Sequence, residues 1–208
     1  MITRVTEEKD KGDILDLMEP LIAEWFDNKF DALTEPQGYA IPLIHEMKNV
    51  LVSSPTGSGK TLTAFLSIIN ELYKLDKEDE LEDKIYCVYV SPLKALANDI
   101  HKNLEEPLEE INELAREKGM KVPEIRTAIR SGDTSQKERR KMAKNPPHIF
   151  ITTPESLGLV LSSPKFREKF DDVQYFINDE IHEISSSKRG VFLSLNTERL
   201  ENHVKGEM

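Results

Sequence analysis

The sequence predicts an α/β domain built on a mostly parallel sheet with helices on both faces. Two observations favour this class. Short apolar runs rich in Val, Ile and Tyr alternate with longer helical patterns, and a glycine-rich loop joins the first of these runs to a helix. A chain of 208 residues is long enough for one core of ordinary size and too short for two full domains.

Five runs are short and apolar enough to be strands that are buried on both faces. They are 49–53, 85–91, 125–130, 148–152 and 173–178. Helical patterns lie at 60–74, 94–118, 135–143, 154–161 and 189–203, with two more at 14–26 and 36–47, before the first strand. Since open parallel sheets bind ligands at the carboxyl ends of their strands, we expect the functional residues there.

The composition restricts the possible metals and the location of the protein. Cys87 is the only cysteine, so an internal disulfide and a thiolate zinc site are excluded, and the five histidines lack metal-ligand spacing. A metal would therefore need oxygen ligands. The longest apolar run, 85–90, is far shorter than a membrane span, and no signal or transit pattern opens the sequence, so we expect a cytoplasmic protein without a membrane partner.

The net charge of -10 argues mildly against binding to nucleic acid, because phosphate contacts need Lys and Arg. Many of the Asp and Glu residues, however, lie in two blocks at 76–83 and 105–113 that are typical of a solvated surface. A basic cluster lies apart from them at Lys137, Arg139, Arg140, Lys141 and Lys144. This cluster predicts either a positive face for phosphates or an ordinary solvated helix surface.

The segment from Ser54 to Thr61 is a candidate phosphate loop of the Walker A type. It follows a predicted strand and leads directly into a predicted helix, which is the required context. Glycines allow successive N–H groups to point into one hollow at a helix N-terminus, where phosphate is favoured. The ATP-binding residues that we predict in this loop are Thr56, Gly57, Ser58, Gly59, Lys60 and Thr61. Ser54 replaces the usual Gly or Ala, and a plain Gly/Ser turn is the alternative interpretation.

A pair of carboxylates follows the last predicted strand, at Asp179 and Glu180. Such a pair can place one carboxylate on magnesium and the other near an attacking water. We predict Mg²⁺ binding by Thr61 and Asp179, and polarisation of the water by Glu180. An isolated Asp-Glu pair would be read as a charged turn, but here it follows a phosphate loop in the same predicted sheet. The predicted catalytic residues are therefore Lys60, Asp179 and Glu180.

With both loops in place, the chain resembles superfamily 2 (DExH-box) helicases, and more narrowly the large helicase-related (Lhr) family. The stretches that carry the resemblance are Leu33-Thr34-Glu35-Pro36-Gln37, Ser91-Pro92-Leu93-Lys94-Ala95-Leu96, Arg130-Ser131-Gly132-Asp133-Thr134, Thr152-Thr153-Pro154-Glu155-Ser156-Leu157, Asp179-Glu180-Ile181-His182-Glu183 and Ser187-Lys188-Arg189-Gly190. The resemblance implies a RecA-like P-loop NTPase domain over 33–208, preceded by a helical extension over 1–32.

The resemblance also implies roles for single residues. Gln37 would read the adenine edge, with Phe26 or Phe30 stacking on the ring, and His182 would couple the nucleotide state to a later motif. Nucleic-acid contacts would come from Pro92, Leu93, Lys94, Gly132, Asp133, Thr153, Pro154 and Glu155. For Gln37 the alternative is an ordinary surface glutamine, and for the strand-end residues it is a helix cap.

The implied activity is hydrolysis of magnesium-ATP that drives 3'-5' movement along single-stranded DNA or RNA. The partner would be a second RecA-like domain, because the sequence ends before motif III, and the present chain alone is expected to be weakly active or inactive. One departure from the family pattern is Asn178, which stands where an apolar residue is usual. A buried amide there would need partners.

Three alternatives remain. A GTP-binding switch is opposed by the position of Asn28-Lys29-Phe30-Asp31 before the phosphate loop and by the lack of an Asp-x-x-Gly motif. A non-hydrolysing ATP-binding scaffold would keep the fold but lose the activity. A DNA translocase of a restriction or remodelling system would share the motor.

Overall fold

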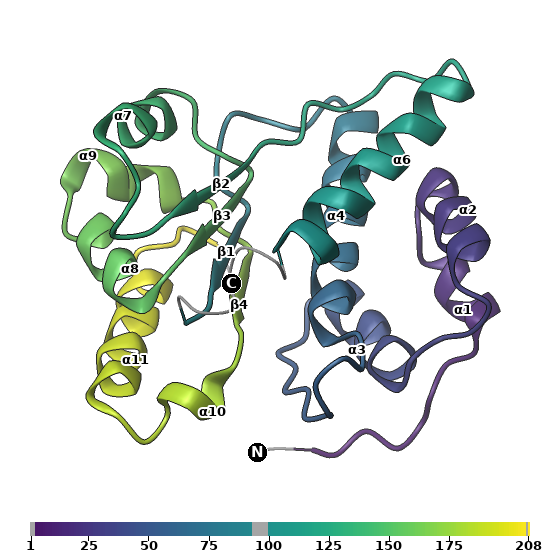
Figure 1. The fold of residues 1–208 in the computed structure, drawn as a ribbon, viewed down its shortest axis with the longest axis horizontal. Coiled ribbons are helices and arrows are strands. Elements are labelled where there is room, and N and C mark those ends of the chain that lie inside the picture. Colours follow the sequence, from purple (N-terminus) through teal and green to yellow (C-terminus); the bar gives the residue numbers. More distant parts are fainter. Residues whose placement is uncertain (1–2, 93–99, 207) are drawn as a thin grey trace. The chain divides into compact units, whose positions relative to one another are not determined.

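The computed structural model describes residues 3–92, 100–206 and 208, which form two compact units. Unit 1 comprises Met1–Leu81 and Asn98–Pro123, and unit 2 comprises Glu82–Ala97 and Glu124–Met208 (Figure 1). Each unit is described by itself. Within the described ranges, no helix has the length and apolar character needed to cross a membrane.

Unit 2 contains a sheet of four parallel strands. They are β1 (Cys87–Val90), β2 (Thr127–Arg130), β3 (Ile149–Thr152) and β4 (Tyr175–Asn178), in the order β2-β3-β1-β4. Each lies inside one of the predicted runs, so the parallel α/β sheet and four of its five expected strands are confirmed.

The prediction of a fifth strand at 49–53 was wrong. Residues 49–53 lie directly before the phosphate loop and have no strand structure, and the sheet is made of the other four strands. Leu51 is 73% exposed, so the apolar run is not packed as a buried strand would be. A strand forms only where the backbone of a neighbour accepts and donates hydrogen bonds, and a short apolar run cannot specify that neighbour by itself.

The helices of unit 2 largely follow the sequence pattern. The predicted patterns at 135–143, 154–161 and 189–203 correspond to α7 (Gln136–Lys144), α8 (Pro154–Leu161) and α11 (Lys188–Glu201). Three short elements were not predicted: α9 (Pro164–Arg167), the 3-10 helix η2 (Glu168–Phe170) and α10 (Ile181–Ile184). They have three or four residues each, too few to show a helical period.

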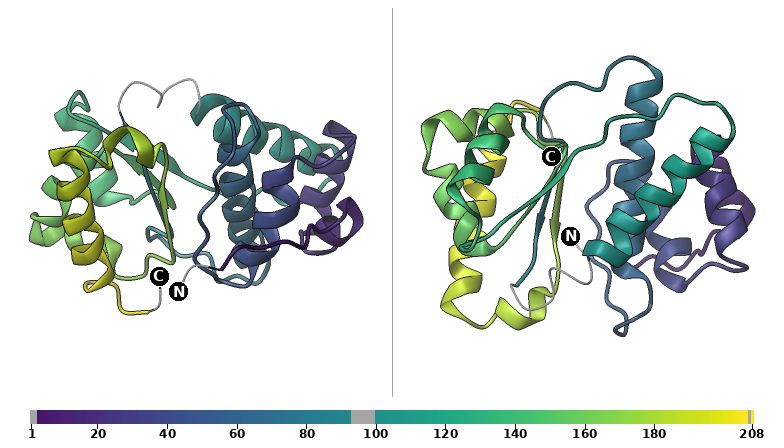
Figure 2. Two further views of the ribbon diagram at one scale, coloured as in Figure 1. Left: turned by 90° about the horizontal axis from the view of Figure 1, so that it is seen from below. Right: turned by 45° about the horizontal axis from the view of Figure 1, so that its top comes forward.

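The core of unit 2 lies between the sheet and these helices. One row of side chains across the sheet, Ala128, Phe150, Val88 and Phe176, packs in the cluster that also holds residues of α7, α8, α9 and α11. Figure 2 shows α8 and α11 on the same side of the sheet in both views. Because side chains alternate along a strand, the next row, which includes Tyr89, points to the opposite face.

Unit 1 is helical. It contains α1 (Lys11–Asp16), α2 (Pro20–Lys29), α3 (Glu35–His45), α4 (Lys60–Lys77), the π-helix η1 (His101–Glu105) and α6 (Glu106–Glu117). The single helix predicted at 14–26 is divided before Pro20, which opens α2 at a position where its missing N–H costs nothing. The pattern predicted at 94–118 is helical from residue 100 to Glu117. Its first residues, 94–99, lie outside the described residues.

Polar contacts tie the first helices of unit 1 to its later ones. The Trp25 indole N–H donates to Glu110 Oε2 at 2.8 Å, and the Glu19 backbone N–H donates to Asn70 Oδ1 at 2.6 Å. Phe26 is fully buried beside Trp25 and Phe30. The N-terminal helices are thus packed on α4 and α6.

His148, next to the first residue of β3, gives a pH prediction. Burial, aided by the nearby Arg126 guanidinium, lowers the pKa of His148 to about 4. The unfolded chain takes up this proton near pH 6.5, so this contribution to stability is complete above that pH and is lost as the pH falls towards 4. We expect the free energy of unfolding to decrease by up to about 1.4 kcal/mol per pH unit from this group.

Urea unfolding of the wild type and of a His148→Gln variant between pH 7 and 5 measures this effect. The variant should show the weaker pH dependence, and a control His45→Gln variant, changed at an exposed position of α3, should behave as the wild type. Equal slopes for wild type and His148→Gln would contradict the prediction.

Candidate functional site

The phosphate loop of unit 1 has the backbone geometry that its glycines predict. Gly57 and Gly59 have φ angles of 81° and 90°, in the left-handed region that other residues rarely adopt. Gly59 is the N-cap of α4, so the helix begins at Lys60 directly behind the loop. The arrangement directs a helix N-terminus, with its favourable dipole for anions, at the loop.

The Lys60 ammonium is held by the loop itself. Its Nζ donates to the backbone oxygens of Ser54 at 2.8 Å and Pro55 at 2.9 Å. In the described part of the chain, Lys60 forms no ion pair with a carboxylate. A positive charge that is satisfied only by neutral carbonyl groups is available for an anion.

Gln37 lies against the phosphate loop. A Cβ at Gly59 would be 3.0 Å from Thr34 Oγ1 and 3.8 Å from Gln37 Nε2. Gln37 is buried, and its Oε1 accepts the Thr34 backbone N–H at 2.8 Å in a helix cap. Its Nε2 is therefore the amide atom beside the loop, and Thr34 Oγ1 is buried there without a hydrogen-bond partner.

The two candidate residues for stacking on adenine differ in burial. Phe26 is fully buried in the core of unit 1, and Phe30 is half-buried.

The two carboxylates in unit 2 follow β4 as predicted. The Asp179 backbone N–H donates to Val90 O at 2.9 Å, so Asp179 continues the pairing of β4 with β1. Glu180 has a φ of 50°, a left-handed conformation that costs a non-glycine residue about 1 kcal/mol and that is concentrated at functional sites. His182 is exposed at the start of α10, with Nδ1 3.3 Å from Glu180 Oε2.

The parallel topology brings the predicted strand-end loops of unit 2 to one edge of the sheet. The loops after β2, β3, β1 and β4 follow one another along it, and they begin at Ser131, Thr153, Ser91 and Asp179. Pro92 is buried in the third of these loops. The predicted residues Leu93 and Lys94 lie outside the described residues.

Two of the predicted nucleic-acid residues have structural partners at the start of α8. Thr153 is buried, and its Oγ1 accepts the Ser156 N–H at 3.3 Å as the helix N-cap. Glu155 forms a two-bond ion pair with Arg189 of α11, at 2.6 and 3.2 Å, and this contact lowers the pKa of the Glu155 carboxyl. Pro154 opens the helix between them. Thr153 therefore caps α8 in this structure, and its contact with nucleic acid stays a prediction.

The loop after β2 is fastened by one member of the basic cluster. Arg139 Nη2 donates to the backbone oxygens of Gly132 at 2.9 Å and Ser131 at 3.4 Å. Gly132 and Asp133 are exposed in this loop, and the Asp133 N–H donates to Ser131 Oγ. Arg139 thus faces its own loop, whereas Arg140 is exposed.

Of the two predicted magnesium ligands, Thr61 belongs to unit 1 and Asp179 to unit 2. The described residues contain no group of three or more His, Cys, Asp or Glu that could hold a metal. Mg²⁺ usually takes one or two protein oxygens and completes its shell with water and phosphate. A carboxylate and a hydroxyl are suitable oxygen donors for such an ion.

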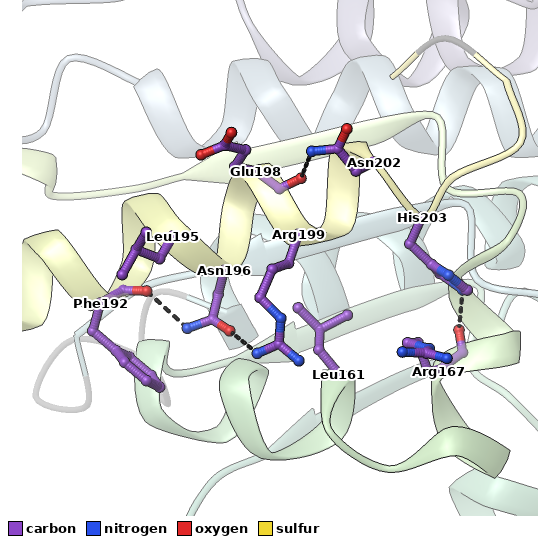
Figure 3. A pocket seen from close by; sticks show the side chains of 9 residues that line it. All are labelled: Leu161, Arg167, Phe192, Leu195, Asn196, Glu198, Arg199, Asn202 and His203. Atoms are coloured by element: carbon purple, nitrogen blue, oxygen red, sulfur yellow. Dashed lines mark hydrogen bonds between the residues drawn. The ribbon is translucent and has the colours of Figure 1, made fainter.

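A surface hollow of about 670 Å³ lies elsewhere in unit 2, between α8, α9 and α11 (Figure 3). Its polar groups already bond to one another. Asn196 Nδ2 donates to Phe192 O, and Arg199 Nη1 donates to Asn196 Oδ1. None of its lining residues is among the predicted site residues.

The sequence-based interpretation missed three residues beside the predicted sites: Thr34 at Gly59, Arg189 at Glu155 and Tyr89 at Asp179. Thr34 and Arg189 stand in stretches that carry the family resemblance, which was a usable signal. Tyr89 gave no such signal, because its partner depends on the register of two strands.

Comparisons with known proteins identify the family of this chain. The profile of the family described as "DEAD/DEAH box helicase" matches residues 34–206. "ATP-dependent helicase Lhr-Core" of Methanothermobacter thermautotrophicus is 56% identical over 207 residues, covering 100% of this chain and 24% of that protein. "Lhr helicase/ probable uracil glycosylase" of Mycolicibacterium smegmatis is 46% identical over 190 residues, covering 91% and 12%. The chain thus spans a quarter or less of the length of these relatives.

Solved structures give the same result. The structure of Mycobacterium smegmatis helicase Lhr bound to ssDNA and AMP-PNP has a TM-score of 0.84 and 43% identity, covering 92% of this chain and 24% of that one. DEAD-box helicase Mss116 bound to ssRNA and UDP-BeF, at 22% identity and a TM-score of 0.80 over 99% of this chain and 40% of that one, supports the RecA-like fold alone. The chain belongs to the DEAD/DEAH box helicase family.

Proposed function

We propose that residues 33–208 form the first RecA-like motor domain of an Lhr-type ATP-dependent helicase, with 1–32 as a helical extension. The observation that carries the proposal is the phosphate loop, in which two left-handed glycines precede α4 and the Lys60 ammonium donates to the backbone carbonyl oxygens of Ser54 and Pro55. The family match, which begins at residue 34, supports the boundary.

The proposed chemistry is hydrolysis of ATP. Lys60 and the loop N–H groups bind the phosphates, and Thr61 and Asp179 supply oxygen ligands for Mg²⁺. When bound, the ion neutralises charge on the phosphates. Glu180 orients and polarises the attacking water. Its left-handed backbone conformation sets the direction in which its side chain leaves the main chain. Gln37 offers its Nε2 beside the loop for recognition of the adenine edge.

Hydrolysis is proposed to need a second RecA-like domain. The relatives are at least four times longer than this chain, since it covers 24% of the Lhr-Core protein. In this fold class the transition-state cation can be supplied by another domain, so the chain alone should hydrolyse ATP weakly or not at all. His182 is exposed and so is accessible for coupling to such a partner.

The proposed substrate is single-stranded DNA or RNA, held by its backbone and moved 3'-5'. The solved structure of the Mycobacterium smegmatis helicase Lhr is bound to ssDNA, which supports single-stranded nucleic acid as the substrate class. The loops after β2, β3 and β1 share one edge of the sheet. We place the nucleic-acid backbone along these loops, which hold Gly132, Asp133, Thr153, Pro154, Glu155 and Pro92. Backbone N–H groups at the start of α8 can donate to phosphate without reading sequence.

Two other functions use the same fold. A translocase of a restriction or remodelling system would move along duplex without unwinding, and the Lhr relatives favour a helicase over it. A non-hydrolysing scaffold would bind ATP without cleaving it. The presence of the three predicted catalytic residues, Lys60, Asp179 and Glu180, disfavours this function.

Calorimetric titration of the chain with ATP, ADP and GTP, with and without Mg²⁺, tests the proposal. We expect binding that prefers adenine nucleotides, because Gln37 is buried beside the loop and cannot rearrange freely for guanine. A Gln37→Ala variant should lose this preference while retaining affinity for the phosphates. Equal binding of GTP and ATP by the wild type would remove Gln37 as the base reader. A folded chain that binds no nucleotide would overturn the proposal for this domain.

A further inference from the structure

Tyr89 of β1 makes a contact that the proposed site does not yet include. Its hydroxyl donates a hydrogen bond to Asp179 Oδ2. The register explains why the two side chains meet. Tyr89 lies opposite Ile177, and Asp179 is two residues further along, so both side chains leave the sheet on the same face. A long aromatic side chain can span such a diagonal pair.

This contact fixes one oxygen of the Asp179 carboxylate. The other oxygen, Oδ1, accepts the Glu180 backbone N–H at 2.9 Å. With one hydrogen bond on each oxygen, both the rotation of the carboxylate and its direction are set. Each carboxylate oxygen has two lone pairs, so the group can still coordinate a metal ion or accept a hydrogen bond from a metal-bound water.

The environment makes the Tyr89 contact hard to replace by water. Tyr89 is only 2% exposed, and a buried hydroxyl that loses its partner costs free energy. A hydrogen bond to an ionised carboxylate is also stronger than a neutral one. The hydroxyl is therefore held on Asp179 by the fold of β1 and β4, before any nucleotide binds.

We infer that Tyr89 is a positioning residue for Asp179, orienting its carboxylate for the magnesium of the bound nucleotide. The inference rests on the proposed function, in which Asp179 serves the metal. Hydrogen-bonding partners of metal ligands typically change metal affinity by about 10-fold to 100-fold when removed. Tyr89 thus acts on Mg²⁺ affinity through the Asp179 carboxylate.

The test uses Tyr89→Phe, which removes the hydroxyl and keeps the ring. The measured quantity is the Mg²⁺ concentration that gives half-maximal binding of a fluorescent ATP analogue by the chain. We expect a rise of about 10-fold in Tyr89→Phe, with unchanged analogue binding in the absence of Mg²⁺. The control is Tyr73→Phe, which loses a buried hydroxyl bonded to Asn112 Oδ1 at 2.6 Å in unit 1. It should leave the Mg²⁺ dependence unchanged.

Asp179→Asn separates this inference from the proposed function. Loss of the Mg²⁺ dependence in Asp179→Asn, together with the shift in Tyr89→Phe, would support both. Loss in Asp179→Asn with a wild-type response in Tyr89→Phe would overturn the role of Tyr89 alone. An unchanged Mg²⁺ dependence in Asp179→Asn would overturn both. Thermal unfolding compares the stability of the two tyrosine variants. If Tyr89→Phe and Tyr73→Phe lose similar stability and only Tyr89→Phe needs more Mg²⁺, the shift in Mg²⁺ dependence is not caused by a general loss of stability.

Discussion

Lys60→Ala is expected to weaken binding of magnesium-ATP by at least about 30-fold. Removing one partner of a desolvated charge pair typically costs 2 to 5 kcal/mol, and about 1.4 kcal/mol corresponds to a factor of ten in Kd. The ammonium is already positioned at the loop by its bonds to Ser54 O and Pro55 O. Its bonds to neutral carbonyls would be exchanged for bonds to phosphate, which carries full negative charge.

The measurement is calorimetric titration of wild type and variant with ATP in Mg²⁺. Lys74→Ala is the matched control, since Lys74 lies in the last turn of the same helix α4. It should bind as the wild type does. Comparable affinities for wild type and Lys60→Ala, in samples with the same unfolding midpoint, would contradict the phosphate-binding role of this loop.

The phosphate loop could be predicted because its determinants are local. Gly57 and Gly59 adopt left-handed backbone conformations, which carry little steric cost in glycine because it has no Cβ. Helix α4 starts directly after them. The helices with clear patterns were also predicted within a few residues. Pro20 shows a limit, because its effect on the preceding residues divided one expected helix into two.

Features that depend on distant segments could not be predicted. The run at 49–53 has strand-like composition, but pairing with a neighbour decides whether a strand forms, and sequence alone does not supply it. The contact of Tyr89 with Asp179 depends in the same way on the register of β1 against β4. A shift of that register by one residue would turn Asp179 to the other face of the sheet.

Contacts of polar and charged residues are also hard to predict from sequence, because the residue type does not identify the residue with which the side chain pairs. The sequence predicts Glu155 at the nucleic acid, which stays a prediction, and it does not reveal the ion pair of Glu155 with Arg189 of α11. Arg139 belongs to a cluster that predicts either a phosphate-binding face or solvated surface, and neither alternative indicates its hydrogen bonds to the backbone of the loop after β2. Asn178 was flagged as an unusual buried amide, and its Oδ1 is indeed buried without a hydrogen-bond partner.

Phe150→Ala is expected to destabilise unit 2 by about 3 to 5 kcal/mol, the usual cost of removing a buried phenylalanine side chain. Phe150 is fully buried on β3, a strand paired on both sides. Its ring contacts Phe166 and Phe170 with centroid distances of 5.7 and 5.4 Å. Because β3 leads into Thr153 and α8, the loss of packing should also loosen the loop at that edge of the sheet.

Urea unfolding followed by circular dichroism measures the expected loss, and Phe150→Leu, which leaves a smaller cavity, should lose less. Trp25, the only tryptophan, lies in unit 1, so its fluorescence reports on the other unit in the same titration. A dichroism transition that moves to lower urea in Phe150→Ala would support the core described for unit 2. An unmoved transition would mean that the aromatic cluster does not hold the sheet to its helices, and the strand-end loops would then need another source of rigidity.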